Sequence, residues 1–226
     1  MSFHRTAELA ADPRVARGLS VQLAARRARI DAGDAPLGWK LAFGTPATME
    51  RLGTAAPLIG YLMRSRLIEG DAGFAVGGWT NPVLEPEVAA HVGDDGEIAA
   101  LGPAFELADI DPPPEDPEAI LAGNAFHRAV MIGPAAPGAS PAELSGRIRR
   151  SAGETQIVAD VQAANGEIVP LVRHVVDLLP AFGEALRPGD VVICGSIVAP
   201  PLPAAPGDDV TYELEPLGGI SIRLTA

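Results

Sequence analysis

Three glutamates in an apolar setting are the residues of this sequence whose spacing best suits chemistry. Glu85 and Glu87 stand two apart at the start of a run that alternates like an extended strand. Side chains two apart on a strand leave the same face, roughly 6.5–7 Å apart along it. Two carboxylates on one half-buried face repel each other, so their burial is costly unless a positive charge joins them. Oxygen-only ligands favour a hard divalent ion such as Mg²⁺ or Mn²⁺. The simpler alternative is that the two glutamates lie on a solvated strand edge and bind no metal.

A third carboxylate is expected to join this pair through a hairpin. Residues 94–96 (DDG) are typical of a tight turn between two strands. A return strand would bring Glu106, which lies in the apolar phrase AFELA, back beside Glu85 and Glu87. Apolar neighbours on both strands favour burial of the three acids. We therefore predict a metal site formed by these three glutamates.

Composition restricts the class of protein and its partners. The chain has 226 residues, 47% hydrophobic and 20% charged, which indicates one large globular domain or a domain with an extension. Its net charge of −12 argues against nucleic acid and anionic membranes as partners. The single cysteine, Cys194, excludes an internal disulfide. We find no secretory signal and no apolar run of the ~20 residues that span a bilayer, and we expect a cytoplasmic protein.

Hydrophobic periodicity places the longer helices near the N-terminus and late in the chain. Residues 6–33 have helical spacing, and Asp12-Pro13 is expected to divide them into two helices. Residues 171–186 are expected to form a helix that is interrupted at Pro180, with His174 on or near its surface. Shorter helices are predicted at residues 47–52 and 118–122.

Strand patterns dominate the rest of the chain. Alternating or β-branched runs predict strands at residues 37–44, 191–198, 210–214 and 219–224, and Asn165-Gly166 predicts a hairpin over residues 153–170. The order of elements favours an α+β fold with a mainly antiparallel or mixed sheet rather than a regular βαβ array. We divide the chain into an N-terminal helical segment, residues 1–36, and one continuous domain, residues 37–226.

Several other polar residues have both a structural and a functional interpretation. Lys40 lies among apolar neighbours, so it either extends its amine to water or sits in a cleft where desolvation favours the neutral, acid/base form. Arg64 and Arg66 are either surface cations or recognise a substrate carboxylate. Gly195-Ser196 interrupts an apolar strand, which indicates either a plain bulge or a ligand close to the backbone, with Ser196 donating to an oxyanion.

Several phrases together resemble the 2-keto-4-pentenoate hydratase family of the fumarylacetoacetate hydrolase-like superfamily. Their order and approximate spacing hold from about residue 20 to the end of the chain. The matching stretches are 38–41 (GWKL), 43–46 (FGTP), 60–62 (GYL), 85–89 (EPEVA), 103–109 (PAFELAD), Asn124, 187–192 (RPGDVV), Gly195-Ser196 and 218–222 (GGISI). Each phrase is weak alone, but the ordered set is specific.

The resemblance implies a twisted, mixed or antiparallel β-sheet roll with N-terminal helices. It also implies Mg²⁺ or Mn²⁺ held by Glu85, Glu87 and Glu106, and a small 2-oxo or 2-hydroxy-dienoate substrate that chelates this metal. Lys40 would move a proton between enol and keto forms, while water adds to the terminal carbon and gives a 4-hydroxy-2-oxo acid. Substrate oxygens would be bound by Ser196, Gly195 and Asn124. Such hydro-lyases of aromatic catabolism form homo-oligomers, in some cases with a related decarboxylase.

The sequence departs from the family pattern close to the expected substrate pocket. Arg64-Ser65-Arg66 stand where members often carry acids, Gly123 stands where many have Asp, and Phe126 and His127 replace small serines. A second substrate carboxylate could pair with the two arginines, so a decarboxylase of 2-oxo-dienedioates or a C–C bond hydrolase is an alternative. A non-catalytic partner subunit is another, although the retained lysine and glutamates oppose it.

Overall fold

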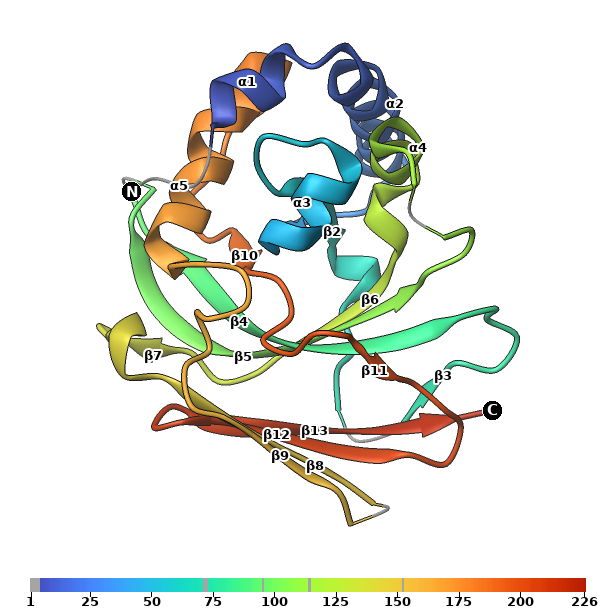
Figure 1. Ribbon diagram of the computed structural model, residues 1–226, viewed down its shortest axis with the longest axis vertical. Coiled ribbons are helices and arrows are strands. Elements are labelled where there is room, and N and C mark those ends of the chain that lie inside the picture. The colour runs from blue at the N-terminus through green and yellow to red at the C-terminus, as the bar shows by residue number, and fades with distance from the viewer. Residues whose placement is uncertain (1–4, 71–72, 95, 114, 152) are drawn as a thin grey trace.

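Helices, a large sheet and a small sheet form three successive layers in the computed structural model (Figure 1). The structure describes residues 5–70, 73–94, 96–113, 115–151 and 153–226. In Figure 1 the helices lie over one face of the large curved sheet, and the small sheet lies beneath its other face. The helices are α1 (Thr6–Ala11), α2 (Pro13–Asp31), α3 (Pro46–Leu52), α4 (Pro117–Ala122) and α5 (Ile168–Leu178), with 3₁₀ turns at Arg64–Arg66 (η1), Asn124–Phe126 (η2), Pro141–Glu143 (η3) and Leu179–Phe182 (η4).

The two sheets are mainly antiparallel, as the sequence predicts. The large sheet has the order β2-β1-β10-β4-β5-β6, with β11 paired to β4 and β7 paired to β5. Its strands are β1 (Pro36–Ala42), β2 (Leu58–Met63), β4 (Pro82–Val92), β5 (Ile98–Asp109), β6 (His127–Ile132), β7 (Ala136–Pro137), β10 (Val191–Ile193) and β11 (Leu202–Pro203). The small sheet has the order β3-β13-β12-β8-β9 and consists of β3 (Phe74–Ala75), β8 (Ser145–Arg150), β9 (Thr155–Val158), β12 (Asp209–Glu215) and β13 (Gly218–Thr225). Among the described pairs, β1–β10 and β13–β3 are parallel, and the α+β fold class is confirmed.

The long hairpin of β4 and β5 is the element that positions the acids. Its register pairs Glu85 with Glu106 and Glu87 with Ala104, as expected for strands joined by a tight turn. The Gly93 amide donates to the Glu97 carbonyl at 2.8 Å across the turn, whereas Asp95 of the predicted turn lies outside the described residues. The hairpin prediction is therefore confirmed on both sides of its tip.

The core lies on both faces of the large sheet. Trp39 of β1 is fully buried towards the helices, where the Arg26 guanidinium of α2 lies 4.9 Å from its ring centroid. On the other face Phe105 of β5 packs against Tyr212 of β12, with ring centroids 5.9 Å apart. Gly38 permits the close pairing of β1 with β10, because a Cβ there would stand 1.9 Å from the Val191 carbonyl oxygen.

The N-terminal helices share this core with the strands. Asp12 separates α1 from α2 as predicted, and its side chain caps α2 by accepting from the Arg14 amide at 2.8 Å. Buried Gln22 donates to the carbonyls of Ile59 and Leu121, which ties α2 to β2 and α4. The boundary at residue 36 stays a prediction.

Two strand predictions differ from the structure. The hairpin over residues 153–170 is wrong, because β9 pairs with the preceding β8, and Asn165 lies in a turn before α5. The strand over residues 191–198 ends at Ile193, because Gly195 takes a φ of +86° and redirects the chain away from β1.

The surface position predicted for His174 is also wrong. This side chain is 1% exposed, and α5 turns it towards α1 and the segment before β2. Its Nδ1 bonds the Thr6 hydroxyl at 2.8 Å and its Nε2 bonds the Pro57 carbonyl at 2.9 Å. The interruption of the helix near Pro180 is confirmed, since α5 gives way to a 3₁₀ turn at Leu179.

Replacing Gly18 by alanine is expected to separate α2 from α4. A Cβ at this position would stand 2.6 Å from the Glu118 carbonyl oxygen and 2.8 Å from the Leu121 Cβ. The overpacking cost exceeds the gain in helix propensity, so Gly18→Ala should lower the free energy of unfolding by about 1–2 kcal/mol. Urea denaturation measures this change. The exposed Ser20→Ala on the same helix should be neutral, and an equal response of the two variants would contradict close packing at Gly18.

Candidate active site

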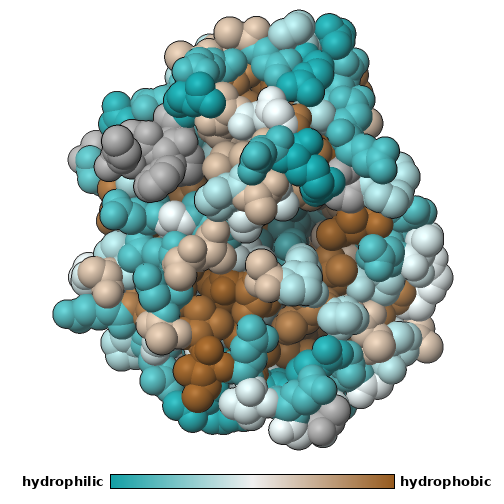
Figure 2. All heavy atoms as spheres, in the orientation of Figure 1, coloured by the Kyte–Doolittle hydropathy of each residue, from teal (hydrophilic) through white to brown (hydrophobic). Residues whose placement is uncertain are grey.

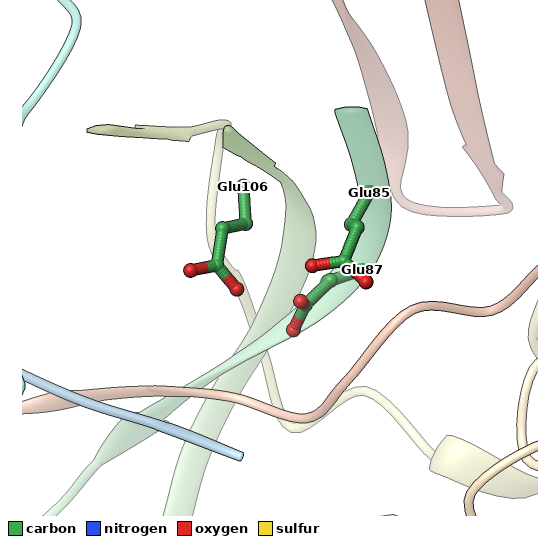
Figure 3. A group of neighbouring side chains, drawn as sticks. All are labelled: Glu85, Glu87 and Glu106. Carbon is green, nitrogen blue, oxygen red and sulfur yellow. The ribbon is translucent and has the colours of Figure 1, made fainter. Parts of the chain in front are cut away.

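Three glutamate side chains converge where β4 and β5 pair (Figure 3). Glu85 and Glu87 come from β4 and Glu106 from β5, and their carboxylates point towards one another. One oxygen from each lies within 4.8 Å of the others. Glu87 and Glu106 are fully buried, and Glu85 is half-buried. The structure thus brings together the three acids that the sequence predicts to meet.

The oxygens of these carboxylates are only partly satisfied by the protein. Glu87 Oε2 accepts from the Gly195 amide at 2.6 Å, and Glu106 Oε1 accepts from Lys40 Nζ at 2.6 Å and from His127 Nδ1 at 2.7 Å. The other oxygens of Glu87 and Glu106 are buried and have no hydrogen-bond partner among the described residues. Buried acceptors without partners are rare in folded proteins. Carboxylate oxygens alone, arranged in this way, fit a hard divalent cation.

The pKa values of the three carboxylates show why a cation would stabilise the cluster. Burial, and then the charge of Glu106, raises the pKa of Glu85 to about 7. The same causes raise the pKa of Glu87 well above its ordinary value. Burial acts in the same direction on Glu106, but Lys40 and His127 outweigh it and lower that pKa. The cluster therefore holds more negative charge than its one lysine can balance.

Lys40 is the only lysine of the chain, and it lies beside this cluster. Its side chain is 2% exposed, and its amine also donates to the Ala125 carbonyl at 3.1 Å. Burial acts to lower its pKa, but the carboxylates, Glu106 foremost, outweigh burial and raise it. The expectation that desolvation favours the neutral amine is therefore wrong here. Gly60 leaves room for the stem, because a Cβ there would stand 2.9 Å from Lys40 Cγ.

A cavity of about 310 Å³ adjoins Lys40 and Glu85. Most of its lining is apolar, and Arg51 is the one arginine that borders it within the described part of the chain. Arg51 is exposed, so it marks the solvent side, whereas Lys40 marks the inner end. Figure 2 shows that this face of the molecule is hollowed below α3, with hydrophobic residues beside the hollow. The cavity is lined by residues 40–45, Thr48, Arg51, Glu85, Ala108, Ile110, Ala125, Phe126, Asn165, Gly195, Ser196 and 198–201.

Unusual backbone conformations gather around this cavity. Among the described residues, the only non-glycine residues with positive φ are Phe43 (55°) and the segment Asn124 (54°), Ala125 (47°) and Phe126 (64°). Such conformations cost on the order of 1–3 kcal/mol each and cluster at functional sites. Three of the four residues line the cavity, and the Phe43 and Phe126 rings meet edge to face with centroids 6.2 Å apart. Residues with unfavourable backbone conformations therefore form part of the cavity wall.

The segment at Gly195 connects one carboxylate to the cavity wall. Ser196 lines the cavity, but its hydroxyl donates to the Val198 carbonyl at 2.8 Å. Asn165 lies across from it and donates to the Ser196 carbonyl at 2.6 Å. The substrate-binding roles of Gly195 and Ser196 stay predictions. Sequence reasoning missed Asn165, because Asn-Gly was interpreted as a hairpin turn.

The other predicted substrate-binding residues lie away from this cavity. Both amide atoms of Asn124 are used by Tyr61, whose backbone N–H donates at 2.8 Å and whose carbonyl accepts at 3.0 Å. Arg64 and Arg66 are exposed on the 3₁₀ turn after β2, and neither lines the cavity. Among the described residues, Arg51 rather than Arg64 or Arg66 is the arginine at the cavity. No sequence signal marked Arg51, because only the position of α3 brings it there.

Comparisons with known proteins agree with this fold. No protein-family model matches the sequence. The 4-oxalocrotonate decarboxylase of Pseudomonas putida is 24% identical over 222 residues, which cover 90% of this chain and 83% of that protein. A 4-oxalocrotonate decarboxylase of a Pseudomonas species is also 24% identical, over 213 residues that cover 87% and 82% of the two chains.

Solved structures place the chain in the same fold class. A 4-oxalocrotonate decarboxylase from Pseudomonas putida G7, complexed with magnesium and adipate, superposes with a TM-score of 0.83 at 24% identity, covering 92% of this chain and 84% of that one. A fumarylpyruvate hydrolase from Pseudomonas aeruginosa, complexed with Mn²⁺ and pyruvate, gives 0.62 at 14% identity, with coverages of 83% and 88%. The chain has the fumarylacetoacetate hydrolase-like fold, but these relatives do not single out the hydratase family. Within the described residues, no helix has the length and apolar character needed to cross a bilayer.

Exchanging Glu87 for glutamine should separate metal affinity from stability. The amide keeps an acceptor for the Gly195 amide but removes one of three ligand charges, so affinity for Mn²⁺ should fall at least about 100-fold. Burial raises the pKa of Glu87, so a neutral glutamine costs less to bury than the charged carboxylate. After a chelator has removed the metal, Glu87→Gln should therefore be at least as stable to unfolding as the parent chain. Calorimetric titration and thermal unfolding measure the two effects. The exposed Glu143→Gln serves as control, and unchanged Mn²⁺ affinity in Glu87→Gln would remove the site.

Proposed function

We propose that this chain is a divalent-metal-dependent enzyme that acts on a 2-oxo acid, and that its reaction is the decarboxylation of a 2-oxo-dienedioate of the oxalocrotonate type. The observation that carries this proposal is the cluster of three carboxylates, two fully buried and one half-buried, at the inner end of an apolar cavity with Arg51 at its solvent side. The two curated relatives, both 4-oxalocrotonate decarboxylases, support the same choice.

Glu85, Glu87 and Glu106 would hold Mg²⁺ or Mn²⁺. The solved decarboxylase and hydrolase relatives are complexed with magnesium and Mn²⁺, respectively. When bound, the ion supplies positive charge beside the carboxylate and 2-oxygen of the substrate, where negative charge develops. Unpartnered oxygens on Glu87 and Glu106 are the feature of this chain that fits it.

Lys40 is placed to serve the proton step of decarboxylation. The bond between the distal carboxylate and its neighbouring carbon breaks, and carbon dioxide leaves. The electron pair moves through the conjugated double bond to the 2-oxygen, which gives a dienolate, and one proton completes the product. The charged amine of Lys40 lies at the inner end of the cavity and is held by Glu106 and the Ala125 carbonyl, so it can supply that proton.

The outer walls of the cavity favour decarboxylation over hydration. Glu85 is the only acid among the described residues that line the cavity, and it belongs to the carboxylate cluster. The wall beyond it is formed largely by Phe43, Phe126 and the Val198–Pro201 segment. A hydratase needs a group that activates water at the far carbon, and this wall offers none. An apolar wall does, however, favour decarboxylation, because the charged carboxylate leaves as neutral carbon dioxide.

Hydration of a 2-hydroxy-2,4-dienoate is the second candidate. The ordered phrases of the 2-keto-4-pentenoate hydratase family favour it, as does the shared requirement for a dienolate beside Lys40 and the three glutamates. Hydrolysis of a C–C bond is a further alternative, and a non-catalytic role beside another subunit is an outcome of the assay below. The retained lysine and carboxylates oppose the non-catalytic role.

One assay distinguishes these functions. The purified protein with Mg²⁺ is incubated separately with 4-oxalocrotonate and with 2-hydroxypenta-2,4-dienoate. We expect carbon dioxide release from the first compound and no hydroxylated product from the second. Lys40→Ala should keep its Mn²⁺ affinity but lose at least about 100-fold in kcat, because the proton donor is gone. Hydration of the dienoate would favour the second candidate, and inertness towards both compounds would favour a partner subunit.

Arg51→Gln is expected to weaken binding of the distal carboxylate. The exposed guanidinium at the solvent side of the cavity suits a substrate with a second anionic group. KM for 4-oxalocrotonate should rise about tenfold, with a smaller change in kcat, while inhibition by oxalate, which lacks the distal group, stays the same. Arg64→Gln, outside the cavity, is the matched control. If KM rises in Arg64→Gln and not in Arg51→Gln, the turn after β2 binds the distal carboxylate instead.

A further inference from the structure

A second cavity, of about 220 Å³, lies on the other side of the segment Asn124–His127. Ala125 and Phe126 line the cavity described above, whereas Asn124 and His127 line this one. The two cavities share no lining residue. Asn124 is fixed to β2 by both of its bonds to Tyr61, so the segment between the cavities is a fixed wall. None of the functions considered above uses this second cavity.

Positive charge gathers around the second cavity. Arg29 of α2, Arg66 of the turn after β2 and Arg128 of β6 all line it, and no acid does among the described residues. Arg128 has one long ion pair, 3.8 Å from Asp109, outside the lining. The whole chain carries a net charge of −12, so three arginines around one cavity are a local reversal of that charge. Guanidinium groups from separate elements bind oxyanions by charge-assisted hydrogen bonds.

His127 forms the buried side of this cavity. Its side chain is 3% exposed, and its Nδ1 lies 2.7 Å from Glu106 Oε1. Nε2 is buried and has no hydrogen-bond partner among the described residues. Three arginines and a polar inner wall suit an anion that offers several oxygen atoms.

We propose that this cavity binds a tetrahedral oxyanion, with inorganic phosphate as the probe. The oxyanion pairs with Arg29, Arg66 and Arg128, and it lies against the His127 side of the cavity. Binding here reaches Glu106 through the Nδ1 hydrogen bond, so the site adjoins the carboxylate cluster without entering the catalytic cavity.

Calorimetric titration of the chelator-treated protein with inorganic phosphate tests this site. We expect saturable binding that Arg66→Gln weakens about tenfold, because one charged partner is lost. Arg64→Gln, from the same exposed turn but outside the cavity, should bind phosphate like the parent chain. Arg51→Gln should also leave phosphate binding unchanged, because Arg51 belongs to the other cavity. Sulfate and glycerol phosphate should compete with phosphate for this site, because each offers oxyanion oxygens to the same three arginines.

Three results would overturn the proposal. No binding of millimolar phosphate, or equal binding by the parent and Arg66→Gln, removes the site. Loss of binding in Arg51→Gln places the anion in the catalytic cavity instead. Arg66 is exposed, so thermal unfolding of Arg66→Gln should match the parent and separates loss of binding from loss of fold.

Discussion

Repulsion among three carboxylates, two fully buried and one half-buried, is the constraint on which the rest of this structure depends. Glu85 and Glu106 stand opposite each other in the hairpin register, and Glu87 follows on the same face. The protein offsets this charge only in part, with the Lys40 amine, the His127 ring and the Gly195 amide. Two buried oxygens remain without partners. The fold therefore keeps a negative cluster whose stability depends on a further positive charge.

The elements around the cluster bring polar groups to its carboxylates. The strand β1 brings the only lysine to Glu106, and the break after β10 turns a backbone amide towards Glu87. The turn at Asn124–Phe126 adopts left-handed conformations that cost free energy, and this turn separates the cavity beside Lys40 from the arginine-lined one. The hydrophobic core, to which both the sheets and the N-terminal helices contribute, supports this strained turn.

Local signals in the sequence were enough to predict the carboxylate cluster. A strand period of two and a turn between the strands fix which residues meet across a hairpin, so Glu85, Glu87 and Glu106 could be grouped. Residues that depend on tertiary placement could not be found in this way. Asn165 suggested a hairpin turn, Arg51 lay on an unremarkable helix, and His174 was placed at the surface, because nothing local records which element packs over another. The resemblance predicted the fold, whereas the proposal of decarboxylation over hydration draws on the cavity lining and the curated relatives.

The central claim is that three glutamates of one hairpin share a single divalent cation. Anomalous scattering from a crystal soaked in Mn²⁺ locates such an ion directly and does not depend on activity or substrate. The account predicts one strong peak between Glu85, Glu87 and Glu106, with Lys40 outside the coordination sphere. A peak elsewhere on the molecule, or well-ordered glutamates with no peak between them, would contradict it.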